Sequence, residues 1–390
     1  MNLFSRTDKS FLGQWWWTVD RAMLLAFMIL ILFGMVLVTT ASTAVAESHN
    51  WDTYYFIKRH FVLIPITVII LLVVSMMSPR MIWRLASVVF IGSLLAMILV
   101  LFFGTEIKGA QRWIRVFGFS LQPSEFVKPA FAIVAAWFMS RQKENANFRG
   151  NAIAAGLYFV TIALLLLQPD LGMTLVITSI WASQIFLAGF PFRLLIGLGG
   201  VIASGVAGAY FMFDHVQSRV NRFFFPESGD NYQVDRSLEA FQNGGIIGTG
   251  PGQGTVKQVL PDAHADFIFS VAGEEMGLVF VLVIIAVFAF VVRRGFNRLM
   301  DSGNMFAVLA VGGLLTMFGL QALVHMGSSM NIMPTKGMTL PFISYGGSSI
   351  LSLGFSMGAV LALTRRSARI GVSRSGLSRR PKKTKAGVGA

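Results

Sequence analysis

Residues 22–43 read AMLLAFMILILFGMVLVTTAST, a run that contains no Asp, Glu, Lys or Arg. The hydrocarbon core of a bilayer requires about 20 apolar residues per spanning helix, so this run predicts a transmembrane helix. Working outward from it, we find similar runs along the whole chain, separated by polar segments. They predict spans at 22–43, 61–78, 85–103, 124–140, 152–167, 171–189, 194–213, 268–292, 304–326 and 344–364. The predicted fold class is all-α, a polytopic membrane protein with about ten transmembrane helices.

The composition agrees with a membrane protein and excludes several other classes. Hydrophobic residues make up 55% of the 390 residues and charged residues only 13%, which is more apolar than a soluble core requires. The chain has no cysteine, so disulfides and thiolate metal sites are excluded. The net charge of +14 follows the predicted membrane topology, and we therefore expect no nucleic acid partner.

Lys and Arg are distributed unevenly among the segments between the predicted spans. With ten spans both termini lie on one side, and the short segments on that side carry most of the basic residues. The positive-inside rule therefore predicts a multi-pass protein of the inner (cytoplasmic) membrane with both termini in the cytoplasm. We divide the chain into a cytoplasmic N-terminal segment (1–21), a membrane domain (22–364) with one long extracytoplasmic loop (214–267), and a basic tail (365–390). The tail is expected to be disordered and to contact anionic membrane lipid.

Polar and charged residues of the spans gather near the predicted extracytoplasmic ends, which is where we expect function. Glu125 and Lys128 lie three residues apart on one helix face and can pair, and Ser124 can cap that helix. Asp170 is either a turn or helix-start residue or part of a binding site. His325 is either a packed interhelical hydrogen-bond donor or a functional group. The shared location of these residues favours one functional site.

The long extracytoplasmic loop has two recognisable parts. Val234, Leu238 and Phe241 are spaced for one face of a short amphipathic helix at the membrane interface. A glycine-dense stretch follows, Gly248-Thr249-Gly250-Pro251-Gly252-Gln253-Gly254. Such a stretch either lets the backbone approach a ligand closely or forms a flexible loop, and it matches no Walker pattern.

Five motifs occur in order along the chain. They are 109–114 (GAQRWI), 122–128 (QPSEFVK), 168–172 (QPDLG), 260–269 (LPDAHADFIF) and 340–349 (LPFISYGGSS). Together they resemble the SEDS family (shape, elongation, division and sporulation), and the resemblance extends from the first span to the tenth.

Residues 333–339 (MPTKGMT) resemble the cell-division branch of that family more than the elongation branch. The chain departs from the family pattern at Asp262, where Glu is common, at Ala265, where Thr is usual, and at Pro251. None of these departures removes the aspartate of the His-x-Asp motif, which is Asp266.

The resemblance implies a peptidoglycan glycosyltransferase that polymerises lipid II into glycan strands at the outer face of the membrane during septal cell division. Asp266 is the essential aspartate by this resemblance. Joining a diphosphate-activated sugar to a hydroxyl with inversion at the anomeric carbon requires a base, and we expect Asp266 to supply it. Its alternative role is that of an acidic residue at a helix start.

The leaving diphosphate requires positive charge, for which Arg112, Lys128 and Lys336 are the candidates. Arg112 and Lys128 are expected to position phosphate or carboxylate groups. Trp113 is either a platform for sugar or lipid or an ordinary interfacial anchor. Further candidate substrate-binding residues are Glu125, Asp170, His264, Glu275 and Ser348. A divalent cation (Mg or Mn) held by carboxylates is an alternative source of charge, and no metal ligands are assigned.

The resemblance also implies partners. They are lipid II and the lipid-linked glycan strand, a class B penicillin-binding transpeptidase, and other membrane proteins of the division septum. Two alternative functions stay open. A lipid II flippase would favour a polar path through the bilayer, which the charge-poor span centres argue against. A non-catalytic division scaffold would tolerate substitution of Asp266.

Overall fold

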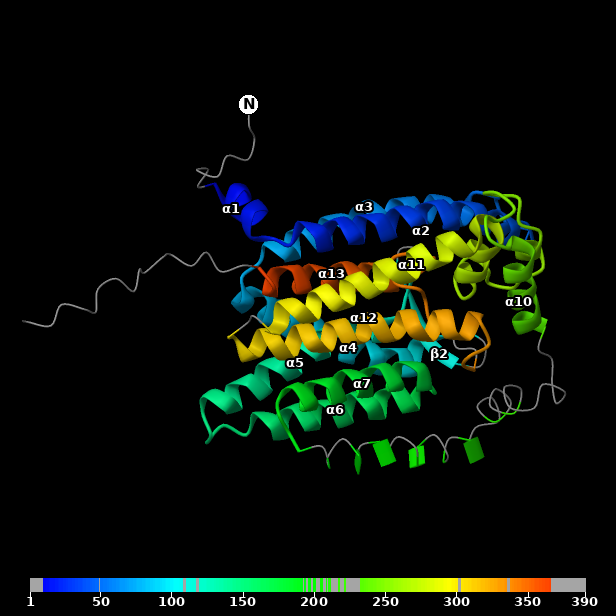
Figure 1. Ribbon diagram of the computed structural model, residues 1–390. Coiled ribbons are helices and arrows are strands. Elements are labelled where there is room, and N and C mark those ends of the chain that lie inside the picture. Colours follow the sequence, from blue (N-terminus) through cyan, green and yellow to red (C-terminus); the bar gives the residue numbers. More distant parts are fainter. Residues whose placement is uncertain are drawn as a thin grey trace, which may run out of the picture.

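The computed structural model shows a bundle of long helices that run between two ends (Figure 1). It describes residues 10–48, 50–107, 110–116, 119–191, 232–300, 303–334 and 337–365, together with a few residues between 193 and 221. The helices of the bundle are α2 (Arg21–Ser48), α3 (Tyr55–Met76), α4 (Pro79–Phe103), α5 (Pro123–Glu144), α6 (Gly150–Leu167), α7 (Leu171–Leu187), α11 (Ile268–Met300), α12 (Met305–Ser329) and α13 (Gly347–Leu363).

These helices confirm the predicted multi-pass membrane fold. Within the described residues, 6 helices are long and apolar enough to cross a membrane, and α7 and α13 are shorter apolar helices. Each predicted span except 194–213 coincides with a helix, and that span lies largely outside the described residues. The structure describes only parts of the segments 1–21, 214–267 and 365–390, and the division of the chain into these segments stays a prediction.

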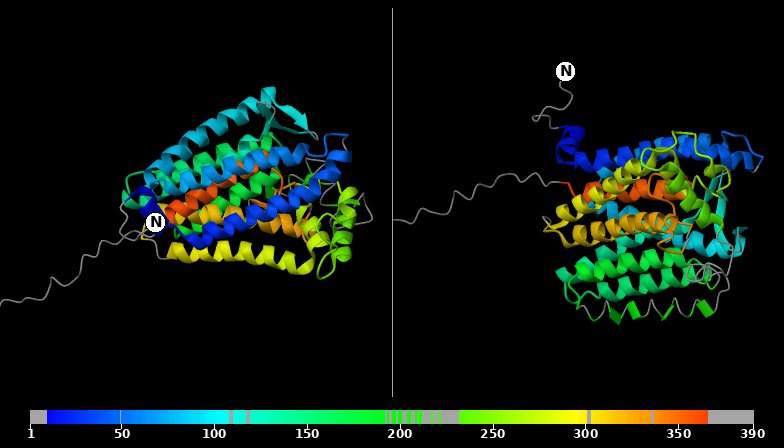
Figure 2. Two further views of the ribbon diagram at one scale, coloured as in Figure 1. Left: turned by 90° about the horizontal axis from the view of Figure 1, so that it is seen from above. Right: turned by 45° about the vertical axis from the view of Figure 1, so that its right-hand side comes forward.

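The two ends of the bundle differ in what they carry. We call the end at which α2 begins and α13 finishes the terminal end, because the described chain begins and ends there (Figure 1). The opposite end carries a small sheet and a short helix, and the two further views agree (Figure 2). We call it the site end, because the His-x-Asp motif lies at the start of α11 there.

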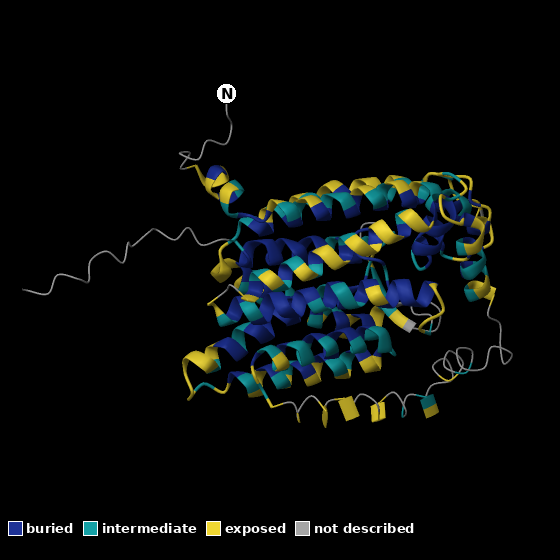
Figure 3. Cartoon of the chain, viewed as in Figure 1, coloured by how far each residue is buried: buried dark blue, intermediate teal, exposed yellow. Residues whose placement is uncertain are grey.

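The centre of the bundle is formed by α5 and α12. Small residues make this packing close: Ala132 and Ala135 of α5 are fully buried, and a side chain on Gly313 of α12 would press against Gln184 of α7. The Gln184 amide donates to the carbonyl of Ala132, at 2.6 Å. Outer helices instead present apolar side chains to the surroundings, visible as the exposed stripes of the upper helices in Figure 3.

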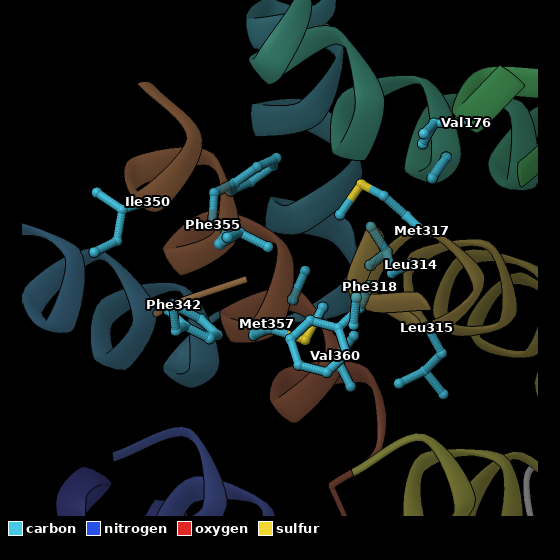
Figure 4. Packing of buried hydrophobic residues seen from close by; sticks show 14 of the residues in the cluster. Val176, Leu314, Leu315, Met317, Phe318, Phe342, Ile350, Phe355, Met357 and Val360 are labelled. Carbon is cyan, nitrogen blue, oxygen red and sulfur yellow. The ribbon is translucent and has the colours of Figure 1, made fainter. Parts of the chain in front are cut away.

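An aromatic layer joins α2, α12 and the segment before α13. The rings of Phe27, Phe318 and Phe342 lie with their centroids 5.8–6.3 Å apart. Figure 4 shows Phe318 and Phe342 among the buried side chains of α12 and α13, including Met357 and Val360. Through Phe342, this layer holds the segment before α13 against α2 and α12.

The structure adds one small sheet to the predicted all-α fold, which it otherwise confirms. Between α4 and α5 lies a three-stranded antiparallel sheet in the order β1-β2-β3, formed by β1 (Thr105–Ile107), β2 (Ala110–Val116) and β3 (Phe119–Leu121). Residues of β2 pair antiparallel with β1 on one side, Gln111 opposite Glu106, and with β3 on the other, Arg115 opposite Ser120. The motif that contains Arg112 and Trp113 is therefore a strand.

Three short helices complete the described structure. The predicted amphipathic helix is confirmed as α10 (Tyr232–Gly244), and it packs on α11: the Ser237 hydroxyl lies 2.5 Å from that of Ser270. Beyond it comes the 3-10 helix η2 (Val256–Gln258). At the terminal end, α1 (Phe11–Thr18) precedes α2, and the indole N–H of its Trp15 donates to Ser75 at 3.0 Å.

A buried charge cluster that the sequence did not reveal holds the terminal end. Asp20 is only 3% exposed, and its carboxylate accepts the Nε–H of Arg294 at 2.8 Å and that of Arg298 at 2.9 Å. It also accepts the backbone N–H groups at the start of α2. Burial raises the pKa of Asp20, but the hydrogen bonds from Arg294 and Met23 and the two positive charges outweigh it and leave this pKa below its ordinary value of 3.8.

We expect Asp20→Asn to lower the free energy of unfolding by about 1.5–3 kcal/mol at pH 7, the range for hydrogen bonds to charged groups. Because the folded-state pKa is depressed, this contribution is present above the unfolded pKa and is lost as the pH falls through the folded pKa. Thermal unfolding of wild type and variant in detergent, at pH 7 and near pH 3, measures the stability difference and its loss at low pH. The control is Asp52→Asn, since Asp52 pairs with Lys58 on the exposed surface. A stability gap that stays the same at both pH values would contradict the assignment.

Candidate functional site

Asp266 stands two residues before α11, at the site end of the bundle. Its side chain is partly exposed, and its backbone N–H donates to the carbonyl of Asp262 at 2.9 Å. A Cβ atom placed on Gly337 would lie 3.2 Å from Oδ2 of Asp266. The chain at Gly337 therefore passes directly beside this carboxylate, which leaves no room for a larger residue without moving one of them.

Two hydrogen bonds fasten the motif that carries Asp266 to the chain before α13. The Ser344 hydroxyl donates to the Ala265 carbonyl at 2.7 Å and accepts the N–H of Leu340 at 2.8 Å. The N–H of Tyr345 donates to the carbonyl of His264 at 3.0 Å. Because these bonds hold the two residues that precede Asp266, they fix the direction from which its carboxylate projects.

His264 itself is buried in an aromatic cluster. Its ring centroid lies 4.3 Å from that of Phe56 and 5.1 Å from that of Tyr345, and only 4% of the residue is exposed. His264 thus packs against these two rings, and its role as a substrate-binding residue stays a prediction.

Arg112 of β2 connects the sheet to the turn between α6 and α7. Its Nε–H donates to the carbonyl of Gln168 at 2.9 Å, and its Nη2 donates to that of Pro169. Its Nη1 lies 3.6 Å from Oδ2 of Asp170. Arg112 is more accessible than Lys128, the other paired cation near this turn: 27% of its side chain is exposed, against 1% for Lys128. Trp113 follows it on the strand and is half-buried.

Asp170 caps α7, as expected for a helix-start residue. Its Oδ1 accepts the N–H of Met173 at 3.1 Å, and its Oδ2 accepts the side-chain N–H of Gln122 at 3.4 Å. Only 6% of Asp170 is exposed. The turn interpretation is therefore confirmed, and the Arg112 contact adds a link from this turn to the sheet.

Glu125 and Lys128 form the predicted pair in the first turns of α5. Nζ of Lys128 lies 2.8 Å from Oε2 of Glu125, and the side chains are 1% and 7% exposed, respectively. The expectation that Ser124 caps α5 is wrong: Gln122 occupies the N-cap position, and the buried Ser124 hydroxyl has no hydrogen-bond partner among the described residues. Pro123 at the first helical position shifts the helix start upstream of Ser124.

Serines of α13 hold the start of α5 in place. Ser348 is 3% exposed, and its hydroxyl accepts the backbone N–H of Gln122 at 2.8 Å. One turn later, the Ser352 hydroxyl donates to the carbonyl of Glu125 at 2.7 Å. Ser348 thus supports the buried ion pair, and its role as a substrate-binding residue stays a prediction.

The segment 337–345 links these groups to Asp266. Besides Gly337 at the Asp266 carboxylate, the side chain of Met338 lies against Gly172 at the start of α7, next to Asp170. The Met338 carbonyl lies 2.7 Å from Nδ1 of His325, so His325 is a buried hydrogen-bonding residue, and its partner lies in this segment and not in a helix. Thr339 bonds to Ser349 of α13 at 2.7 Å. The segment therefore joins the aspartate to the turn of Asp170 and to the α13 serines.

Two predicted site residues are not brought to this group by any described contact. Glu275 pairs with Lys257 of η2, at 2.6 Å, where both side chains are buried. Lys336 lies outside the described residues. The parts played by Gly337 and Ser344 were not predicted from the sequence. The signal was present, since both belong to quoted motifs, but nothing local showed which distant residues they contact.

Comparisons with known proteins agree on the same kind of protein. A family model of cell cycle proteins, FtsW/RodA/SpoVE, matches residues 20–369. A protein of Caulobacter vibrioides named "Probable peptidoglycan glycosyltransferase FtsW" is 44% identical over 364 residues, covering 93% of each chain. Its namesake in Geobacter metallireducens is 36% identical, covering 89% of this chain and 95% of its own.

Two solved structures share the fold. One, described as "Structural coordination of polymerization and crosslinking by a peptidoglycan synthase complex", has a TM-score of 0.73 and 27% identity over 89% of this chain and 97% of its own. The other, the rod shape determining protein RodA of Thermus thermophilus, has a TM-score of 0.66 and 26% identity over 90% of this chain and 97% of its own.

Proposed function

The chain belongs to the FtsW/RodA/SpoVE family of cell cycle proteins and is a peptidoglycan glycosyltransferase, and from that premise we propose that it polymerises lipid II with Asp266 as general base. The observation that carries the proposal is the Asp266 carboxylate. It is partly exposed at the site end, is flanked by Gly337, and projects from a backbone that Ser344 and Tyr345 hold in place.

The proposed reaction forms one glycosidic bond and breaks one sugar–phosphate bond. Asp266 takes the proton of the acceptor 4-hydroxyl as its oxygen attacks the anomeric carbon, the configuration inverts, and the lipid diphosphate leaves with the bonding electrons. Diphosphate is a good leaving group, so little acid assistance is required. Positive charge in a site that excludes water stabilises it further.

We assign that charge to Arg112 and Lys128, as groups that position phosphate or carboxylate. Arg112 is the more accessible, and we propose that Trp113, its half-buried neighbour on β2, contacts the sugar or lipid part of the substrate. Lys128 is buried, so we propose that it acts indirectly, through its ion pair with Glu125. Lys336 is a further candidate, three residues before Thr339.

A divalent cation is a separate part of the proposal. The described residues contain no group of three or more His, Asp or Glu side chains that could hold a metal ion. They therefore do not form a resident metal centre by themselves, and no step above depends on one. We propose that Mg²⁺ or Mn²⁺, where it acts, binds mainly to the substrate diphosphate.

The site end is proposed to face the extracytoplasmic side, with both termini in the cytoplasm, at the division septum. The charge distribution along the sequence supports this orientation. A lipid-linked substrate keeps its chain in the bilayer while its diphosphate sugar meets the site end. The likeness to a peptidoglycan synthase complex supports a class B transpeptidase as partner, beside other septal membrane proteins.

The experiment that tests the reaction class uses vesicles that contain the purified protein, its class B transpeptidase and fluorescent lipid II, with and without Mg²⁺ or Mn²⁺. Gel electrophoresis detects glycan strands, and a membrane-impermeant quencher detects transfer of lipid II between leaflets. Glycan ladders that depend on the protein support the proposal. Leaflet transfer without ladders under every condition would instead favour the flippase, and neither signal would favour a scaffold.

A further inference from the structure

Membrane helix α11 is broken near its start, at Gly277. This residue has φ 77° and ψ −178°, a conformation that is accessible to glycine and strained for other residues. The break separates a short first part, Ile268–Met276, from the rest of the helix. Asp266 lies just before this first part, so its position depends on how the first part is held.

The glycine-rich loop repairs the break through its backbone. In an unbroken helix the N–H groups of Leu278 and Val279 would bond to the carbonyls of Glu274 and Glu275. Here they donate to loop carbonyls instead, those of Gly245 at 3.0 Å and Ile246 at 3.2 Å. The freed carbonyls of Glu274 and Glu275 accept the N–H groups of Thr249 at 2.9 Å and Gly250 at 2.9 Å. All four backbone groups are thus satisfied, as the membrane environment requires.

The glycines at this contact are required by space as well as by conformation. A Cβ atom on Gly277 would overlap the backbone N of Gly248 and approach the carbonyl of Ile246, and one on Gly248 would overlap the carbonyl of Glu275. A Cβ atom on Gly244 would overlap the carbonyl of Gly273, and one on Gly273 would overlap the ring of Phe241. The loop and the helix therefore contact each other backbone to backbone.

Two side chains of the first part of α11, Glu274 and Glu275, bind the later part of the loop, residues 252–257. Oε1 of Glu274 accepts the backbone N–H groups of Thr255 at 2.9 Å and Val256 at 3.0 Å. Glu275 pairs with Lys257, whose Nζ also donates to the carbonyl of Gly252 at 2.9 Å. Both glutamates are 1% exposed, so these bonds are shielded from water.

We propose that the break at Gly277, together with the Glu274 clamp on Thr255 and Val256, positions Asp266 for catalysis. The loop fixes the first part of α11 from one side, and Ser344 and Tyr345 fix the two residues before Asp266 from the other. Gly277 and Glu274 are positioning residues, since they act through the backbone of α11. This inference rests on the proposed function of Asp266.

Gly277→Ala tests it. The added methyl group displaces the loop from the break, and a misplacement of a catalytic group by about 1 Å can cost about 100-fold in rate. We expect kcat for lipid II polymerisation to fall by about that factor, with KM changed by less than about threefold. Hydrogen exchange should accelerate in residues 245–250 and 277–280 while that of α12 and α13 stays unchanged. The matched control is Gly92→Ala in α4, where an added Cβ meets no atom within 4 Å.

A second pair of variants covers the case in which Gly277→Ala does not fold. Glu274→Ala leaves the N–H groups of Thr255 and Val256 without an acceptor, and we expect kcat to fall. Glu274→Gln keeps an acceptor oxygen and should restore kcat to near the wild-type value.

The proposal is overturned if folded Gly277→Ala polymerises lipid II at the wild-type kcat, or if Glu274→Gln is as impaired in kcat as Glu274→Ala. Asp266→Ala, assayed in parallel, distinguishes a failure of the proposed function of Asp266 from a failure of the positioning inference. If it is active, the proposed function of Asp266 fails. If it is inactive while Gly277→Ala and Glu274→Ala are fully active, only the positioning inference fails.

Discussion

Asp266→Asn is expected to lower the turnover of lipid II polymerisation by about 10²–10⁴-fold, the range that general acid–base catalysis contributes. The asparagine side chain has almost the same shape as aspartate, so its packing beside Gly337 should persist. It cannot accept the proton of the acceptor hydroxyl. Initial rates of glycan formation at saturating lipid II measure the loss, and thermal unfolding in detergent shows that the fold is intact.

Asp262→Asn is the matched control for that substitution. Asp262 lies four residues upstream in the same motif, and its φ of 53° is one that asparagine tolerates. Its backbone carbonyl, which accepts the N–H of Asp266, is unchanged by the substitution. We expect turnover within about threefold of wild type, because the backbone bond between Asp266 and Asp262 is kept. Equal losses in the two variants would show a general effect of removing charge from this motif and would contradict a specific role for Asp266.

Lys128→Met is expected to destabilise the protein by about 3–5 kcal/mol, the cost of leaving one member of a buried ion pair without its partner. Glu125 is 5% exposed, and the backbone around it is held by Ser352, so water has little access to its carboxylate. Thermal unfolding in detergent measures the change. Arg141→Met is the control, because Arg141 pairs with Glu144 on the exposed surface near the other end of α5.

The double variant Glu125→Gln/Lys128→Met separates stability from activity. With both charges removed, no buried charge lacks a partner, and stability should return to within about 1 kcal/mol of wild type. Polymerisation should stay impaired, because the proposal assigns the Lys128 charge to positioning phosphate or carboxylate groups. Full recovery of both stability and polymerisation would show instead that the pair is only structural.

The spans could be predicted from the sequence because the bilayer imposes a simple requirement on every helix that crosses it. Charge-free runs such as 22–43 and 304–326 have few alternatives, and the structure confirms them as α2 and α12. The sheet at 105–121 escaped prediction because its strands are only 3–7 residues long. Propensity carries little weight over so short a range, and local pairing decides the structure.

The candidate site could be predicted in part. Glu125 and Lys128 pair because they are three residues apart on a helix, and Asp170 caps α7 because it follows a Pro in a turn, so both depend on local geometry. The contacts of Gly337 with Asp266 and of Asp20 with Arg294 join residues far apart in the chain. No local pattern encodes such contacts.

The glycine stretch shows the same limit. Glycine is common in membrane helices, so Gly277 within an apolar run gave no clear indication of a break. The interpretation of 248–254 as a ligand-binding or flexible loop also missed its backbone contacts with Glu274 and Glu275. Those contacts depend on how the loop folds back onto α11, and a loop of this composition is compatible with many conformations.

The central claim is that Asp266 acts in the bond-forming step, and one paired measurement tests it most directly. Wild-type and Asp266→Asn proteins, each in vesicles with the transpeptidase, are given the same radiolabelled lipid II. Bound substrate and glycan polymer are then quantified in the same sample. The account predicts equal binding by both proteins and polymer from the wild type alone. Polymer formed at the wild-type rate by folded Asp266→Asn would contradict it.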